Sequence, residues 1–504
     1  MLTALNEEHC VNLYSGAEVR ALDRIAIDAF GIPGIVLMKR AARAVFARII
    51  AKGARSIAVL CGSGNNAGDG YVIAGLARLQ GMDVQLLQVG DAAILRGDAA
   101  TARDWAVSSG VHIEQFAVDM ALDGEVIVDA LLGTGLQGPA RPAFAAAIAA
   151  INAHAANGKA WVIAVDLPSG LDADTGDDFG CAVDADETVT FIGAKRGSLT
   201  GVGPQRCGAI WFDDLDVPAS TYAKIPYPVV ALRWGASGAR PMGPRPRHAH
   251  KGTSGHVLVV GGASGYGGAA LLAAEGALRA GAGLVSLACA LEHAAAVLAR
   301  RPEVMVRGIE DVAVQFAPLL ARATVIVIGP GLGQDAWSQA MLAAAINSKL
   351  PLVIDADALN LLAASSQPWP QDALLTPHPG EAARILNCTT REVQQDRFAA
   401  VRALAARTCG VVVLKGAGSL IDDGHHTWLC MDGNPGMAVG GMGDVLAGML
   451  GALRAQGLSA VEAARHGVCL HARAGDLMAA RSGERGLLPS DLLEVVPGLL
   501  NGRI

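Results

Sequence analysis

The sequence predicts an α/β protein of two domains, each built on a parallel sheet. Three observations lead to this fold class. The chain has 504 residues, more than one hydrophobic core usually serves. Short β-branched runs alternate with alanine-rich helical patterns, an order typical of parallel strands joined by helices. A strand, a glycine-rich loop and a helix follow one another from Ser56 and again from His256, which indicates the start of an α/β domain at each place.

Composition favours a large apolar interior and excludes several classes of function. Hydrophobic residues make up 52% of the chain and aromatic residues only 4%, which suits helices packed closely on a sheet. The net charge of −7 gives no electrostatic reason to bind nucleic acid or an acidic membrane. The cysteines stand singly, without a C-x-x-C pair, which argues against a zinc site or a disulfide framework. We expect a cytoplasmic protein without a signal peptide or a membrane span.

The N-terminal half is predicted to open with two helices. Ser15 and Glu18 have the spacing of a capping box ahead of an apolar helical pattern, and a second helix is expected after Pro33. The strands that follow are predicted at residues 56–62, 84–89, 126–132, 162–165 and 188–192.

Polar loops follow three of these strands. They read G-S-G-N-N-A-G-D-G from Gly62, D-A-L-L-G-T-G-L from Asp129 and D-L-P-S-G from Asp166. The carboxyl ends of parallel strands meet at one edge of a sheet, where ligands bind. We therefore predict one nucleotide or phosphate site there. The alternative interpretation is that Asp129 and Asp166 only cap turns at strand ends.

Residues 226–240 are predicted to link an N-terminal domain of residues 1–225 to a C-terminal domain of residues 241–504. The surrounding stretch is rich in Pro and Arg and has neither helical nor strand periodicity. Its arginines, Arg240, Arg245 and Arg247, are interpreted as solvated residues of a connection and not as a binding patch.

The C-terminal half repeats the order of strand, loop and helix with different loop sequences, so we treat it as an unrelated domain. A helix is predicted at residues 271–280. The strands are predicted at residues 256–262, 284–288, 325–328, 352–354, 373–375 and 411–414.

Glycine-containing loops after these strands carry the groups expected to do chemistry. The K-G-A-G-S loop from Lys415 offers a cation, backbone amides and a hydroxyl for nucleotide phosphates, although its order is not that of a Walker A loop. The G-G-M-G-D turn from Gly440 leads into a helix that carries Asp444 near its start. A carboxylate beside an anion site would repel phosphate, so we interpret Asp444 as a base that takes a proton from a hydroxyl. The alternative is an acidic residue that complements the helix dipole.

Several motifs together resemble a known enzyme family. H-K-G-T-S-G-H-V-L-V-V-G-G, G-P-G-L-G, T-P-H-P-G-E, K-G-A-G-S and G-G-M-G-D-V-L-A-G are similar to the motifs of ADP/ATP-dependent NAD(P)H-hydrate dehydratases, which have a ribokinase-like α/β fold. The three N-terminal loops resemble those of NAD(P)H-hydrate epimerases, which implies a Rossmann-like parallel-sheet domain. In this order, the motifs resemble the bifunctional NAD(P)H-hydrate repair enzymes over essentially the whole chain. Ala67 and Met442 depart from the usual Gly and Thr; Ala67 should be tolerated if its φ is negative, and Met442 removes a hydroxyl from the phosphate site.

The resemblance implies that the C-terminal domain dehydrates the S hydrate of NADH or NADPH through a phosphorylated intermediate, with ADP or ATP and Mg²⁺. Asp444 would remove the proton of the hydroxyl, whose oxygen then attacks the terminal phosphoryl group. Resemblance to bacterial members favours ADP. The residues implied to contact the hydrate are Ala269, Gly331, Gly333, His378 and Asp444. Those implied to hold the nucleotide are Lys415, Gly416, Ala417, Gly418, Ser419 and Gly443.

The resemblance also implies that the N-terminal domain interconverts the R and S hydrates. Loss and return of a hydroxyl needs an acid/base group, and Asp166 is the candidate. The family binds K⁺ through residues that match Asn66, Asp129 and Ser169. The residues implied to hold the dinucleotide are Asn65, Asn66, Ala67, Gly68, Asp69, Gly133, Thr134, Gly135, Leu136, Gln137, Gly138, Pro139 and Asp166.

We expect small-molecule substrates, no nucleic-acid or membrane partner, and a homo-oligomer whose order the sequence leaves open. One alternative function is that of a ribokinase-superfamily kinase for a small alcohol, with a regulatory nucleotide-binding domain. Another is that the N-terminal domain is a binding or scaffolding module without catalytic activity.

Overall fold

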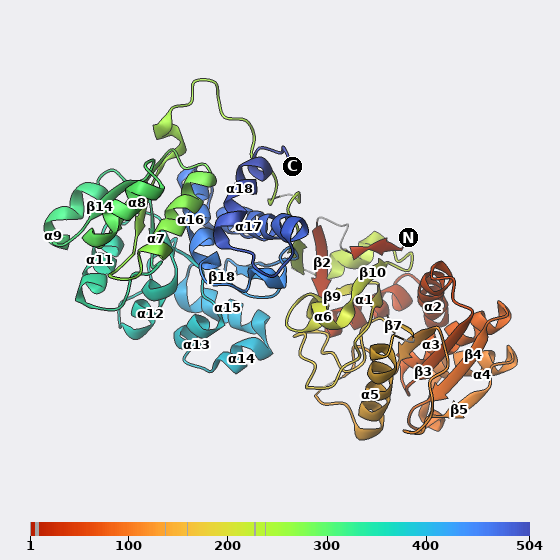
Figure 1. Ribbon diagram of the computed structural model, residues 1–504. Helices are drawn as coiled ribbons and strands as arrows, with labels where there is room; N and C mark the ends of the chain where they lie inside the picture. The colour runs from red at the N-terminus through yellow and green to blue at the C-terminus, as the bar shows by residue number, and fades with distance from the viewer. Residues whose placement is uncertain (1, 6–9, 137, 159, 226–227, 237) are drawn as a thin grey trace. The chain divides into compact units, whose positions relative to one another are not determined.

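A computed structural model describes residues 2–5, 10–136, 138–158, 160–225, 228–236 and 238–504. The chain divides into two compact units, Met1–Val229 and Val230–Ile504, each with its own sheet and helices (Figure 1). Within the described residues, no helix is both long and apolar enough to cross a membrane.

The N-terminal unit has the strand order of a Rossmann-like sheet. The order is β1-β10-β8-β7-β6-β3-β4-β5, and only the edge pair β1 and β10 is antiparallel. Successive strands are added on opposite sides of β3, so the order reverses between β3 and β6, the usual position of a ligand site. The strands are β1 (Thr3–Ala4), β3 (Ser56–Cys61), β4 (Asp83–Gln88), β5 (Ile113–Gln115), β6 (Val126–Ala130), β7 (Trp161–Val165), β8 (Glu187–Phe191) and β10 (Ala209–Asp213).

Helices cover both faces of this sheet because its strands are apolar on both sides. Ile57, Val59 and Cys61 pack in one cluster with residues of α1 to α4, whereas Ala58 and Leu60 pack in another with α5. The predicted capping box at Ser15 and Glu18 begins α1. The helices are α1 (Gly16–Asp28), α2 (Gly34–Ala51), α3 (Asn65–Leu79), α4 (Gly97–Ser108), α5 (Pro142–Ala156) and α6 (Gly203–Cys207), and a parallel strand pair is formed by β2 (Cys10–Tyr14) and β9 (Ala194–Lys195).

The C-terminal unit has a longer sheet in the order β14-β13-β12-β15-β16-β17-β18-β19-β20-β11. The strands from β14 to β18 are parallel, and β18, β19 and β20 are joined as antiparallel hairpins. The strands are β11 (Val229–Leu232), β12 (His256–Val260), β13 (Leu284–Cys289), β14 (Met305–Gly308), β15 (Val325–Ile328), β16 (Leu352–Ile354), β17 (Leu374–Leu375), β18 (Val411–Leu414), β19 (Leu420–Asp422) and β20 (Thr427–Cys430).

One face of this sheet is covered by α7 and the C-terminal helices, which share a single apolar cluster. Helices α7 and α16 touch backbone to backbone, because a Cβ on Gly448 of α16 would lie 1.8 Å from the carbonyl oxygen of Ala273. This close approach fixes the helix that carries Asp444. The helices are α7 (Gly267–Arg279), α8 (Ala294–Arg300), α9 (Val312–Gln315), α10 (Ala317–Leu320), α11 (Ala336–Asn347), α12 (Ala356–Ala364), α13 (Pro379–Leu386), α14 (Thr390–Gln395), α15 (Arg397–Thr408), α16 (Met442–Ala455), α17 (Ala460–Ser482) and α18 (Pro489–Leu500).

The predicted α/β fold with two parallel-sheet domains is confirmed. The stretch predicted as an irregular linker contains a strand. Residues 226–240 contain β11, which pairs in parallel with β20. Its short V-V-A-L run lies beside prolines, whose composition concealed the strand. Residues 229–232 of this stretch therefore belong to the second sheet, beside β20.

Candidate functional site

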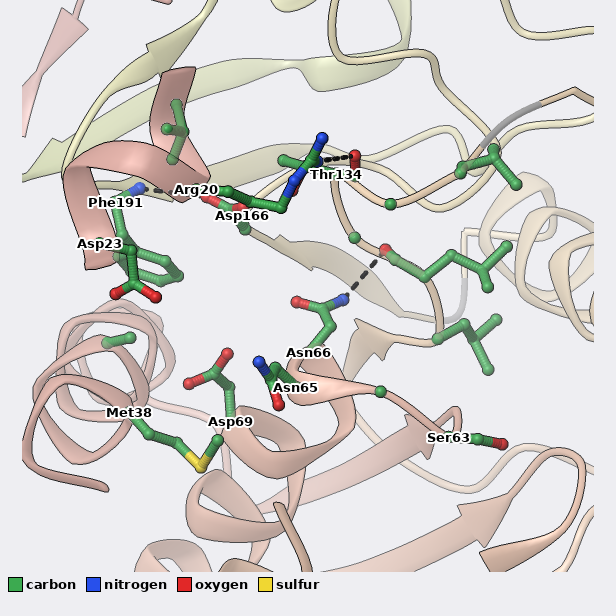
Figure 2. Close-up of a pocket in the computed structure, with 18 of the residues that line it drawn as sticks. Arg20, Asp23, Met38, Ser63, Asn65, Asn66, Asp69, Thr134, Asp166 and Phe191 are labelled. Carbon is green, nitrogen blue, oxygen red and sulfur yellow. Dashed lines mark hydrogen bonds between the residues drawn. The ribbon is translucent and has the colours of Figure 1, made fainter. Parts of the chain in front are cut away.

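A cavity of about 940 Å³ opens at the carboxyl edge of the N-terminal sheet. Its walls include residues that follow β3, β6, β7 and β8, and the strand order reverses between β3 and β6. Figure 2 shows some of the lining residues, among them Asn66, Asp69 and Asp166. The N-terminus of α3 also faces it, so free backbone amides and the helix dipole are available to an anion. The predicted residues that line the cavity are Asn65, Asn66, Asp69, Gly133, Thr134, Gly135, Leu136, Pro139 and Asp166.

Three other predicted dinucleotide residues, Ala67, Gly68 and Gly138, are not among the residues that line this cavity. Ala67 and Gly68 lie in the first turn of α3, and a Cβ on Gly68 would clash with Met38. Ala67 is helical and is not among the residues with positive φ, so the departure from Gly is tolerated as expected. Gly138 lies outside the cavity lining, and Gln137 lies outside the described residues.

Asp166 forms an ion pair with Lys195, a residue that sequence reasoning missed. The Lys195 side chain is only 1% exposed, and its Nζ also donates to Thr190 Oγ1 and to the Phe191 carbonyl, both at 3.1 Å. Asp166 adopts a left-handed φ of 68° at the end of β7, a conformation that is uncommon for a residue other than glycine. The ion pair and the strained backbone hold the carboxylate at the cavity wall. A signal existed in the sequence, since Lys195 closely follows a predicted strand.

Behind the cavity, the three residues matched to a K⁺ site lie together. The buried Asp129 carboxylate accepts hydrogen bonds from the amide and the hydroxyl of Ser169, at 2.7 and 2.6 Å. The Asn66 side-chain amide donates to the Leu132 carbonyl at 3.1 Å, and the Ser169 hydroxyl lies 3.2 Å from the same oxygen. Burial raises the pKa of Asp129 to about 6, although the Ser169 hydrogen bonds oppose the shift. The cluster therefore gathers oxygen atoms from three loops.

In the C-terminal unit, three of the predicted loops meet around Lys415. Its Nζ lies 2.7 Å from Asp355 Oδ1 and 4.0 Å from Glu381 Oε2. The Lys415 amide donates to the Pro377 carbonyl at 2.9 Å, which joins its loop to the T-P-H-P-G-E loop. A Cβ on Gly443 would lie 3.1 Å from Lys415 Nζ, so the turn before Asp444 reaches the same group. Sequence reasoning missed Asp355, which follows the predicted strand at residues 352–354.

Asp444 lies in the first turn of α16, close to this charged group. Burial raises its pKa to about 7, with the carboxylate of Asp355 adding to the shift and Lys415 opposing it. A carboxyl with this pKa can lose and regain a proton near neutral pH, as a general base requires. Beside it, Gly416 and Ala417 are exposed, so the nucleotide loop presents its backbone outward.

The residues that the resemblance assigns to hydrate binding come from two further parts of the C-terminal unit. His378 caps α13, where its Nδ1 accepts from the Gly380 amide at 3.0 Å. Burial and Lys415 lower the pKa of His378, so the neutral ring carries its proton on Nε2. A Cβ on Gly331 would lie 3.2 Å from the Ala269 side chain, so these two predicted residues are neighbours. The Gly333 amide donates to Asp357 at 2.9 Å.

Arg397 was not predicted from the sequence, and its buried guanidinium supports the nucleotide loop through hydrogen bonds to backbone carbonyls. It is 1% exposed, and its guanidinium lies 3.3 Å from the Leu414 carbonyl and 3.4 Å from the carbonyls of Lys415 and Gly418. These carbonyls face the guanidinium, and the exposed backbone of Gly416 and Ala417 lies on the outer side of the loop. Burial lowers the pKa of Arg397 to about 10.

We expect Arg397→Met to weaken both the fold and nucleotide binding. Carbonyls left without a donor should lower the free energy of unfolding of the C-terminal unit by about 2–4 kcal/mol, and ADP affinity should fall about tenfold. Chemical denaturation and calorimetric titration with ADP measure the two effects. Arg391→Met, at an exposed position on α14, is the matched control. Unchanged ADP affinity in Arg397→Met would contradict the supporting role.

Both halves of the chain are similar in sequence to known proteins. A family model described as NAD(P)H-hydrate dehydratase matches residues 257–498, and one described as YjeF-related protein N-terminus matches residues 34–197. A bifunctional NAD(P)H-hydrate repair enzyme from Coxiella burnetii is 45% identical over 493 residues, which cover 97% of this chain and 99% of the relative. This chain belongs to the family of bifunctional NAD(P)H-hydrate repair enzymes. The resemblance inferred from the motifs is thereby confirmed.

Other members of the bifunctional NAD(P)H-hydrate repair enzymes are also similar over nearly their full length. The Escherichia coli enzyme is 40% identical over 494 residues, with 97% of this chain and 93% of the relative covered. Among solved structures, an ADP/ATP-dependent NAD(P)H-hydrate dehydratase from Bacillus subtilis, co-crystallized with ATP and Mg²⁺, is 27% identical. That comparison covers 52% of this chain and 95% of the other, with a TM-score of 0.47.

Proposed function

We propose that this enzyme repairs hydrated NADH and NADPH in two steps. The N-terminal unit interconverts the R and S hydrates, and the C-terminal unit uses ADP or ATP to dehydrate the S hydrate. The observation that carries the proposal is the half-buried Asp444, set beside Lys415 and the exposed nucleotide loop within a chain of this family. A base beside a phosphate site is what a dehydration through phosphorylation needs.

The dehydration step follows from the chemistry of leaving groups. Hydroxide leaves poorly from the ring carbon of the hydrate, whereas phosphate leaves well. Asp444 takes the hydroxyl proton, and the oxygen attacks the terminal phosphoryl group held by Lys415 and the amides of residues 416–419. The ring nitrogen then expels phosphate to form an iminium cation, and loss of a proton from the neighbouring ring carbon restores the reduced coenzyme. Mg²⁺, when bound with the nucleotide, would offset the negative charge of its phosphates, and few protein ligands are expected for this ion.

The epimerase unit would hold its substrate through the cavity described above. The N-terminus of α3 and Arg20 at the cavity wall supply positive potential for the dinucleotide phosphates. Asp166 is the candidate acid/base, oriented by Lys195. The oxygen atoms of Asn66, Asp129, Ser169 and the Leu132 carbonyl form a donor set that suits a hard monovalent cation. K⁺ would be held by these residues, fixing the loops after β6 and β7.

The rate of dehydration should depend on pH through Asp444. Its pKa is raised from 3.8 to about 7, so the carboxyl is protonated and inactive as a base below that pH. We expect kcat/KM for the S hydrate to rise about tenfold per pH unit up to about pH 7 and then level off. Initial rates corrected for the spontaneous reaction measure this profile. A flat profile from about pH 5.5 to 8.5 would contradict the role of Asp444.

The function is tested by incubating separated R and S hydrates of NADH with the enzyme and ADP or ATP. Recovery of dihydronicotinamide absorbance from the S hydrate at once, and from the R hydrate after epimerisation, supports repair. Accumulation of a stable phosphorylated alcohol would instead identify a kinase. A preference for ADP, assembly as a homo-oligomer and a cytoplasmic location stay predictions.

A further inference from the structure

Two carboxyl groups in the N-terminal cavity have no hydrogen-bond partner among the residues that the structure describes. Asp23 comes from α1 and Asp69 from α3, and both line the cavity that Asp166 also borders (Figure 2). Neither carboxyl accepts or donates a hydrogen bond to any other residue in the described ranges. Both side chains are half-buried at the cavity wall, so a ligand in the cavity can reach them.

The surroundings of Asp69 favour its neutral form. Met38 and Leu37 form an apolar part of the same wall. Burial raises the pKa of Asp69 well above 3.8, the negative charges of Asp166 and Asp23 add to the shift, and Lys195 opposes it. The buried thiol of Cys61 also lies near Asp69 and is uncharged at neutral pH. Among the described residues, the other charged groups that line the cavity are Arg20, Asp91, Asp98 and Arg141. The surroundings thus favour the protonated carboxyl of Asp69 in a cavity that Asp166, paired with Lys195, also lines.

The epimerisation proposed above requires two proton transfers at one carbon. The hydroxyl must be protonated before it can leave as water, and a second water must lose a proton when it adds. Inversion also requires that the two waters use opposite faces of the planar cation formed between these steps. A single acid/base group would have to reach both faces of the cation. An acid and a base on different walls of the cavity can each serve one face without moving.

We propose that Asp69 is the second proton-transfer group of the epimerase and works in a pair with Asp166. Asp69 gives its proton to the hydroxyl, the carbon–oxygen bond breaks, and the ring nitrogen lone pair forms a carbon–nitrogen double bond. Water then bonds to the same carbon from the other face, and Asp166 takes its proton. No oxidant or reductant is needed. The enzyme is left with Asp69 ionised and Asp166 protonated, ready for the reverse conversion or for proton return through solvent.

The inference rests on the proposed epimerase function, and Asp69→Asn tests it. Epimerisation is followed by chromatographic separation of the R and S hydrates without nucleotide, so that no dehydration occurs. We expect the rate above background to fall by about 10²-fold or more, while calorimetric affinity for NADPH is unchanged. Asp28→Asn, an exposed carboxyl on α1, is the matched control and should keep the full rate.

The pH profile of the unmodified enzyme provides a second readout that does not depend on the variant folding. Because Asp69 must be protonated, the rate should decline as pH rises through its pKa, and the residual rate of Asp69→Asn should lack this decline. A full rate in Asp69→Asn, or loss of rate only in Asp23→Asn, would overturn the role of Asp69 and leave the epimerase assignment intact. Weaker NADPH binding that accounts for the whole loss of rate would also overturn it. Absence of epimerisation in the unmodified enzyme would instead overturn the proposed function.

Discussion

Replacing Asp444 by Asn is expected to abolish nucleotide-dependent repair of the S hydrate while leaving ADP binding intact. Asn has nearly the same shape but cannot take the hydroxyl proton, so kcat should fall by about 10²–10⁴-fold. The substitution removes a buried group whose ionisation is disfavoured, with its pKa raised to about 7, so we expect no loss of thermal stability. Absorbance recovery measures turnover, and calorimetry measures ADP binding.

Glu303→Gln is the matched control for this experiment, because Glu303 is exposed beside β14 and should show normal turnover. Loss of ADP affinity in Asp444→Asn would mean that the carboxylate organises the nucleotide site and is not its base. Normal turnover with both hydrates would remove Asp444 from the mechanism altogether.

Asp166→Asn is expected to cause the largest combined loss of activity and stability. The epimerisation rate should fall by about 10²–10⁴-fold. Lys195, with its side chain 1% exposed, would keep a buried charge without its carboxylate partner, and the free energy of unfolding of the N-terminal unit should fall by about 3 kcal/mol. Chromatography of the two hydrates and chemical denaturation measure these effects.

The double variant Asp166→Asn, Lys195→Met separates the two roles of this pair. Removal of both charges should restore much of the stability, whereas epimerisation should stay lost. Dehydration of the S hydrate in the same samples is an internal control, since it depends on the C-terminal unit. Recovery of epimerisation in the double variant would show that the carboxylate only stabilises the fold.

The sequence allowed the fold and the general position of both sites to be predicted because parallel strands impose them. A polar loop after an apolar run, as at Asp129 or Asp166, must lie at the carboxyl edge of such a sheet. Loop motifs are local in sequence, so their backbone amides and Asp444 could be recognised without knowing how the helices pack.

Residues whose role depends on packing could not be assigned in this way. Arg397 begins a helix like many solvated arginines, and only the fold buries it beneath the loop after β18. Lys195 closely follows a predicted strand, but its contact with Asp166 depends on the left-handed conformation of Asp166 and on the short strand β9. Strand β11 was concealed by neighbouring prolines. In each case a long-range contact overrides the local pattern.

The most direct test of phosphorylation-driven dehydration follows the hydroxyl oxygen of the substrate. The S hydrate is labelled with oxygen-18 at that hydroxyl and incubated with the enzyme and ADP or ATP, and the released phosphate is analysed by mass spectrometry. If the oxygen attacks the terminal phosphoryl group, one labelled oxygen appears in each phosphate released as the reduced coenzyme is restored. Label found in water, with none in phosphate, would contradict the account.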